Sequence, residues 1–151
     1  VVLQEKSSGP LDDPDSMFQN ASRLNDEILK NRGKVALYMT WANRGRRETQ
    51  RVITDAYEKA ASELGAKLVP VGRAWDSALM QDPDLALYDA DGRHSSEIGA
   101  YLAACVLYAS IYGTSPEGLP GRLLNRGEIL SDLSVSLAAQ LQKIAQQTVS
   151  I

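Results

Sequence analysis

Residues 34–42, KVALYMTWA, form a nearly unbroken apolar run in which hydrophobic side chains do not alternate with polar ones. A strand with one face in water shows that alternation, so its absence predicts a strand buried on both faces. Strands of this kind occur in parallel sheets that helices cover on both sides. The run therefore predicts an α/β fold, and its flanking segments extend that prediction.

Apolar residues recur at helical spacing on both sides of this run. Residues 15–33 predict an amphipathic helix that begins near Asp15 or Ser16 and ends at Gly33. Residues 46–65 predict a second helix, closed by Gly65. The further expected elements are a strand at 1–3, a strand at 66–72, helices at 73–80, 96–112 and 134–149, and a Gly/Pro-rich connection after residue 113. This alternation predicts one doubly wound, three-layer domain with a mainly parallel sheet, in which residues 114–151 supply a connection and a packing helix.

Composition excludes several classes of function. The chain has 151 residues, 44% of them hydrophobic and 23% charged, and a net charge of -3, which fits an ordinary globular domain and not a nucleic-acid-binding one. The basic stretch 44–51 also carries Glu48 and is interpreted as a solvated helix start. No apolar run approaches the ~18 residues that span a membrane. A single cysteine, Cys105, excludes an internal disulfide and is expected to be a buried thiol.

The single histidine, His94, lies three residues after Asp91 in the polar segment DADGRH, directly before the long apolar helix. Polar clusters also follow each expected strand, at 4–9, 40–45 and 71–76. Because ligands gather beyond the carboxyl ends of the strands in open α/β sheets, this pattern places His94 at the mouth of a cleft.

Asp91 and His94 have the spacing of an acid–base pair. The carboxylate can accept the Nδ1 proton and fix the tautomer, which leaves Nε2 free to take a proton from a nucleophile. By spacing alone the alternatives stay open, because a surface histidine at a helix start shows the same pattern. A metal site formed by Asp89, Asp91 and His94 is poorly supported, since the chain has no second histidine or cysteine pair. We expect no metal and no cofactor.

Residues 87–116, LYDADGRHSSEIGAYLAACVLYASIYGTSP, closely resemble the last block of the SGNH hydrolases, also called GDSL-like esterases. In that block an Asp-x-x-His pair precedes the final helix, and here Ser95 stands where proline is frequent. The segments VVLQEKSSGPL (1–11), ALYMTWA (36–42) and VPVGRAW (69–75) are similar to strand ends of one bacterial branch of the superfamily. The four blocks come in the family order over nearly the whole chain.

This resemblance implies a flavodoxin-like sheet and a serine-type hydrolase of esters, commonly the O-acetyl groups of carbohydrates. Asp91 then matches the triad acid and His94 the general base. The block at residues 4–7 stands where the family keeps an oxyanion-hole asparagine, so Gln4 and Ser7 become the candidates for that role, while Lys6 replaces a frequent glutamine. The resemblance also favours an exported protein.

The chain departs from the family pattern in one important respect. The family nucleophile lies in a Gly-Asp-Ser or Gly-Asn-Ser stretch on the first strand of the domain, and no such stretch occurs here. Ser7 and Ser8 are poor substitutes, because Pro10 and a long loop follow them. We therefore expect this chain to be the C-terminal two thirds of the domain, with the first strand or strands and the serine supplied upstream or by a separate polypeptide. The chain alone is then expected to be inactive.

Trp41 and Trp75 each follow an expected strand, so each is a candidate for stacking against a sugar, with core packing as the alternative. The expected partner is a small-molecule or carbohydrate ester, and neither nucleic acid nor a membrane. Two other functions stay open on the same fold: a non-catalytic carbohydrate-binding or interaction module, and an acyltransferase.

Overall fold

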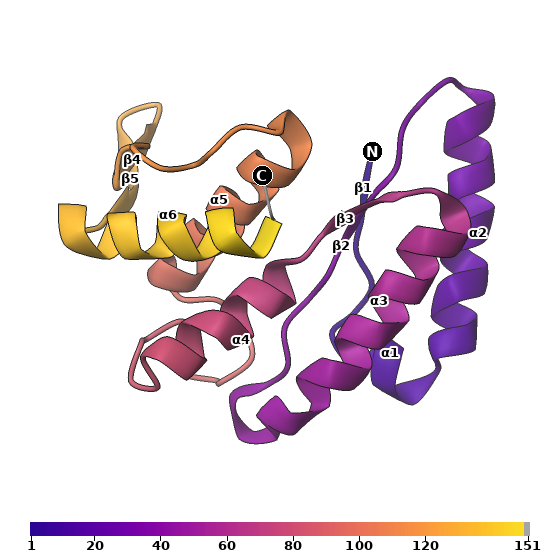
Figure 1. Cartoon of the computed structure of the whole chain (residues 1–151), viewed down its shortest axis with the longest axis horizontal. Helices are drawn as coiled ribbons and strands as arrows, with labels where there is room; N and C mark the ends of the chain where they lie inside the picture. The colour runs from indigo at the N-terminus through magenta and orange to yellow at the C-terminus, as the bar shows by residue number, and fades with distance from the viewer. Residues whose placement is uncertain (150–151) are drawn as a thin grey trace.

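The computed structural model describes residues 1–149 as a three-stranded parallel sheet between two layers of helices (Figure 1). In chain order the elements are β1 (Val2–Leu3), α1 (Gly9–Asp12), α2 (Pro14–Lys30), β2 (Ala36–Tyr38), the 3-10 helix η1 (Arg44–Thr49), α3 (Gln50–Leu64), β3 (Lys67–Val69), α4 (Val71–Gln81), α5 (Glu97–Tyr112), β4 (Arg122–Asn125), β5 (Glu128–Asp132) and α6 (Val135–Val149). The strands lie in the order β1-β2-β3, with Leu37 of β2 paired to Leu3 and to Leu68.

The central strand β2 is covered on both faces, as the unbroken apolar run predicts. Leu37 and Met39 point into one core, which α2 and α3 cover, whereas Ala36 and Tyr38 contact the other core, which α4, α5 and α6 cover. Figure 1 shows the corresponding layers, with α1–α3 on one side of the sheet and α4–α6 on the other. The predicted α/β sandwich with a parallel sheet is therefore confirmed.

Helix α5 is apolar around most of its circumference because it packs against α4, α6 and the sheet. Its Leu102 and Val106 are fully buried, and Cys105 is only 2% exposed, in keeping with the expected buried thiol. Burial raises the pKa of Cys105 to about 11. Despite this apolar character, no helix within residues 1–149 is long and apolar enough to cross a membrane.

The structure corrects several element boundaries. Residues expected to be loop form the short helix α1, and α2 is capped by Asp13, whose Oδ1 accepts the backbone N–H of Ser16 at 2.9 Å. Arg32, with φ of 58°, takes the left-handed position at the end of α2, instead of the expected Gly33. The N–H of Gly33 still bonds to the Ile28 carbonyl at 2.9 Å, which closes the helix.

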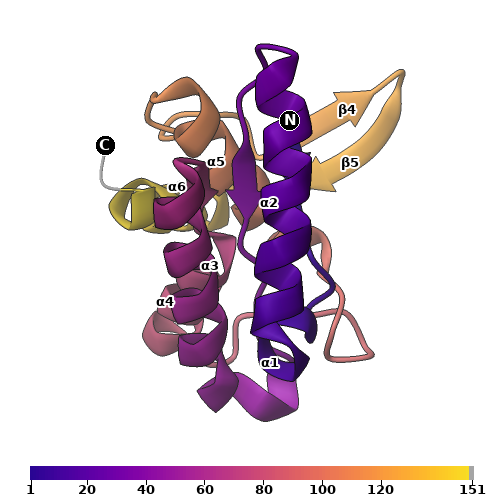
Figure 2. The ribbon, with the colours of Figure 1, turned by 90° about the vertical axis from the view of Figure 1, so that its right-hand side faces the viewer.

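The Gly/Pro-rich connection contains a β-hairpin that the sequence analysis did not predict. Strands β4 and β5 are antiparallel and are joined by Arg126 and Gly127, both at positive φ as in a type I′ hairpin turn. Figure 2 shows this hairpin projecting from the body of the molecule. Its base is held to α5, since Glu97 Oε1 accepts the backbone N–H of Asp132 at 2.6 Å.

Strand β1 lies at an edge of the sheet. It pairs with β2 on one side, and no strand of residues 1–149 covers its other side. Val1 and Val2 are 66% and 47% exposed there. The expectation of further strands beyond this edge stays a prediction.

Candidate functional site

The carboxyl ends of the parallel strands meet at one end of the molecule, drawn in the lower part of Figure 1. The chain leaving β2 there contacts the loop between α4 and α5, and Trp41 Nε1 donates a hydrogen bond to the carbonyl of Arg93 at 2.9 Å. The structure therefore brings the predicted His94 loop to the end of the central strand. This is the position where open α/β sheets bind ligands.

The loop of residues 88–95 folds as a compact reversal. Tyr88 and Ser95 form an isolated antiparallel bridge, and the N–H of Asp89 bonds to the His94 carbonyl at 2.9 Å. Gly92 turns the chain at φ of 69°, a conformation that side chains oppose. Ser96 then caps α5, its Oγ accepting the N–H of Gly99 at 3.1 Å. An Asp-Gly turn followed by a serine cap thus sets the shape of the loop that carries His94.

Asp91 and His94 form a direct contact. Oδ2 of Asp91 lies 2.6 Å from Nδ1 of His94, and Oδ1 accepts the backbone N–H groups of Arg93 at 2.8 Å and His94 at 2.9 Å. These donors, the His94 N–H foremost, followed by the Arg93 N–H and the imidazole, stabilise the carboxylate and lower the pKa of Asp91 to about 2. An ionised Asp91 at Oδ2 favours the imidazole tautomer with the proton on Nδ1.

The pair lies open to solvent. The side chain of His94 is 83% exposed and that of Asp91 is 44% exposed. Among residues 1–149, nothing is hydrogen-bonded to His94 Nε2. With Nδ1 engaged, Nε2 is the ring atom that can accept a proton from a group brought to this surface. The arrangement can therefore act as a general base with its orienting acid.

Gln4 and Ser7 follow β1 and are both exposed. Within the part of the chain that the structure describes, neither is hydrogen-bonded to Asp91 or His94. Their neighbour Lys6 is paired with Asp12, at 3.6 Å between Nζ and Oδ2. The assignment of Gln4 or Ser7 to an oxyanion hole stays a prediction.

Trp41 and Trp75 lie together, but only one of them reaches the surface. Their rings stack with centroids 4.0 Å apart and planes 4° apart. Trp75 is 1% exposed and packs in the core, so in this arrangement it offers no face to a ligand. Trp41 is half-buried and lies next to the His94 loop through its bond to Arg93. Core packing is therefore the role that the structure favours for Trp75.

Two residues at the site were not singled out from the sequence. Arg44 donates from Nη2 to the carbonyls of Tyr88 and Asp89, at 3.2 Å each, and its guanidinium lies 5.3 Å from the centre of the Tyr88 ring. Tyr88 donates from its hydroxyl to the Ala42 carbonyl at 2.8 Å. These contacts join positions more than 40 residues apart, and no local spacing in the sequence indicates them.

Metal binding finds no support in the geometry. Within residues 1–149 no group of three or more His, Cys, Asp or Glu side chains is placed to hold a metal ion. Asp89, the third member of the alternative metal site, accepts the backbone N–H of Ala90 at Oδ1, at 2.7 Å. Asp91 Oδ2 is engaged by the imidazole itself.

Comparison with solved structures supports the fold. A protein from Slackia heliotrinireducens, described as a candidate SGNH hydrolase, matches with a TM-score of 0.63 and 28% identity over 74% of this chain and 64% of its own. A DUF4886 family protein from Bacteroides uniformis matches with a TM-score of 0.73 and 19% identity over 99% of this chain and 61% of its own. No family model and no curated protein matches the sequence.

The fold is SGNH-hydrolase-like. This agrees with the resemblance stated from the sequence and with a hydrolase-type architecture. The chain spans less than two thirds of the length of each of these two solved proteins, at 64% and 61%. The match to the DUF4886 family protein, at 19% identity, shows a similar fold and nothing more.

Proposed function

We propose that this chain supplies the acid and base of a serine-type ester hydrolase. In this proposal Asp91 is the acid that orients the imidazole, and His94 is the general base that takes the proton of a serine hydroxyl through Nε2. The observation that carries the proposal is the 2.6 Å contact between Asp91 Oδ2 and His94 Nδ1, with Nε2 directed to solvent at the end of the central strand.

The nucleophile is proposed to lie on a segment outside residues 1–151. Two observations support this placement. No hydroxyl of residues 1–149 is hydrogen-bonded to His94 Nε2, and β1 has an edge that no strand of those residues covers. A parallel strand added at that edge would end at the same end of the sheet as the His94 loop. The serine would then be brought to His94 at the carboxyl end of the added strand.

We propose carbohydrate O-acetyl esters as the substrates. The half-buried Trp41, beside the His94 loop, is proposed to stack against a sugar ring. Gln4 or Ser7 would serve as a donor to the developing oxyanion. Removing the Trp41 ring with Trp41→Ala is expected to raise KM for acetylated oligosaccharides more than KM for a small aryl ester.

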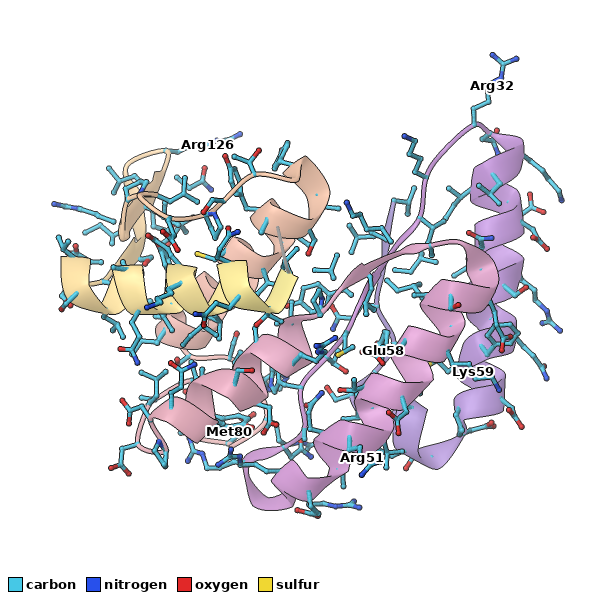
Figure 3. All side chains as sticks on the ribbon, in the orientation of Figure 1. Arg32, Arg51, Glu58, Lys59, Met80 and Arg126 are labelled. Carbon is cyan, nitrogen blue, oxygen red and sulfur yellow. The ribbon has the colours of Figure 1, made fainter. Side chains whose placement is uncertain are left out.

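The test extends the coding sequence upstream and looks for a Gly-Asp-Ser or Gly-Asn-Ser stretch. The extended protein is then assayed on p-nitrophenyl acetate and on acetylated xylo-oligosaccharides. His94→Ala is expected to lower kcat by about a thousandfold or more. Arg32→Gln serves as the control, since Arg32 lies at the far end of α2 and is exposed (Figure 3). Full turnover in His94→Ala would contradict the proposal.

A non-catalytic carbohydrate-binding module is the second candidate. The observation that favours it is the half-buried Trp41 beside the His94 loop, together with the finding that no hydroxyl of residues 1–149 is hydrogen-bonded to His94 Nε2. On this alternative the extended protein binds acetylated oligosaccharides, His94→Ala binds equally well, and neither releases acetate. Acetate release that depends on His94 would exclude it.

A further inference from the structure

Burial cannot hold the Asp91–His94 pair in place. The histidine side chain is 83% exposed and the aspartate 44% exposed, so few packing contacts fix either group. Within the loop, Asp91 accepts from the N–H groups of Arg93 and His94, and the N–H of Gly92 bonds to the Asp89 carbonyl at 3.0 Å. These local bonds shape the loop, but they do not fix it relative to the sheet.

The segment Trp41–Arg44, which begins three residues after the end of β2, connects the loop to the sheet. The N–H of Arg44 donates to the Gly92 carbonyl at 2.9 Å, and its Nη2 donates to the carbonyls of Tyr88 and Asp89 at 3.2 Å. Trp41 Nε1 donates to the Arg93 carbonyl at 2.9 Å. Carbonyls on both sides of Asp91 are thus bound by one short segment of the central strand's end.

This segment is itself held rigidly. The ring of Trp41 stacks on the buried ring of Trp75 at 4.0 Å, and the Tyr88 hydroxyl donates to the Ala42 carbonyl at 2.8 Å. The N–H of Ala42 donates to Oε1 of the buried Gln50 at 2.7 Å. The hydrogen bonds from Trp41 and Arg44 therefore connect the exposed loop to the packed core.

We propose that Trp41 and Arg44 are positioning residues that clamp the 88–94 loop and so hold His94 in its catalytic orientation. This inference rests on the proposed function of the Asp91–His94 pair. Arg44 is the main member of the clamp, because its backbone and guanidinium reach three carbonyls of the loop. Nη2 of Arg44 carries two hydrogens, one for each of the two adjacent carbonyls.

The test compares Arg44→Gln and Trp41→Phe with the control Arg32→Gln. Trp41→Phe removes the indole donor and keeps an aromatic ring on Trp75. Exchange of the Arg93 and His94 amide protons, both of which bond to Asp91 Oδ1, is measured by NMR. We expect Arg44→Gln to speed their exchange at least tenfold and Trp41→Phe to speed it severalfold. The control leaves it unchanged, and the core amides of Ile53 and Leu102 stay protected in all three variants.

In the extended enzyme assayed on p-nitrophenyl acetate, which does not depend on sugar stacking by Trp41, the same two variants are expected to lower kcat at least tenfold while KM changes less than twofold. A displaced base impairs the chemical step and not the binding of this small ester. Unchanged exchange at Arg93 and His94 in both variants would overturn the clamp. If Arg44→Gln also exposes the core amides, the exchange of the Arg93 and His94 amides in Trp41→Phe decides whether the clamp exists. An inactive wild-type enzyme would contradict the proposed function, yet the exchange measurements would still test the clamp.

Discussion

The two oxygens of Asp91 carry different hydrogen bonds. Oδ1 is held by two backbone N–H groups, and Oδ2 faces the imidazole of His94. The two bonds at Oδ1 fix the carboxylate within its own turn, and the contact at Oδ2 sets the tautomer of the His94 ring. A group with this arrangement can orient a histidine at the surface without being buried itself.

Lowering the pH is expected to remove the contribution of Asp91 to stability. The pKa of Asp91 is about 2 in the folded protein and about 3.9 in an unfolded chain. Its contribution to the free energy of unfolding is therefore fully present above pH 4 and is lost as the pH falls toward 2. Urea unfolding followed between pH 5 and 2 should show a steeper loss in the wild type than in Asp91→Asn. Parallel curves for the two proteins would contradict the lowered pKa.

The residues of the pair could be predicted from sequence because both lie in one tight turn. Asp-Gly and the three-residue spacing determine their contact locally, as the 2.6 Å distance shows. Arg44 could not be predicted in this way. Its partners Tyr88 and Asp89 are 44 and 45 positions away, and a stretch rich in arginine is also typical of a solvated surface.

The start of α5 determines where the C-terminal end of the His94 loop lies. Gly99 lies in the first turn of this helix, where an added Cβ would overlap with the Leu87 carbonyl and the Trp75 ring. The absence of a side chain thus lets α5 begin directly against the segment that carries Tyr88. The loop between them is short because the two elements approach so closely.

Gly99→Ala is expected to lower the free energy of unfolding, since neither a backbone carbonyl nor a packed indole can move freely and such overpacking costs about 1–3 kcal/mol. After the ~1 kcal/mol that alanine gains over glycine in a helix, the expected net loss is up to about 2 kcal/mol. Gly45→Ala is the matched control, because an added Cβ there meets nothing within 4 Å. Equal stability of the two variants in urea unfolding would show that the close approach does not constrain α5.

The long elements were predicted from sequence more readily than the short ones. Periodic apolar residues over about four turns indicate α3 and α6, and a long, mostly apolar run indicates α5. The bounds of all three helices differ from the predicted ones by a few residues. The four-residue helix α1 and the β4–β5 hairpin have no such repetition. Pro10 argues against a helix when only the sequence is considered, but in the structure it lies in the first turn of α1, where proline is tolerated. The turn of the hairpin is hard to predict because Arg126, a non-glycine residue, has a positive φ.

The site lies where the two hydrophobic cores of the protein meet. Met39 and Ala42, at the end of β2, pack in one core, while Trp75 and Tyr88 belong to the other. The segment Trp41–Arg44 therefore joins both helical layers to the His94 loop. In the proposed function, a further strand adds at the edge of β1 that no strand of residues 1–149 covers, and it brings a nucleophile toward the same end.

If the serine lies outside this chain, residues 1–151 alone should hydrolyse p-nitrophenyl acetate no faster than their own His94→Ala variant. The extended protein should exceed both by about a thousandfold or more. Initial rates at equal protein concentration give the comparison. Turnover by residues 1–151 that depends on His94 would place the nucleophile within this chain.

The tautomer of His94 shows whether Asp91 orients the imidazole ring, and a chain with one histidine gives a single pair of imidazole nitrogen signals. In Asp91→Asn the two backbone N–H groups should keep the amide oxygen at the Oδ1 position, so that the NH₂ group faces Nδ1 and donates to it. By ¹⁵N NMR at a pH where the ring is neutral, we expect the proton on Nδ1 in the wild type and on Nε2 in Asp91→Asn. A wild-type ring protonated on Nε2, or the same tautomer in both proteins, would contradict the assignment of Asp91 and His94 as an acid–base pair.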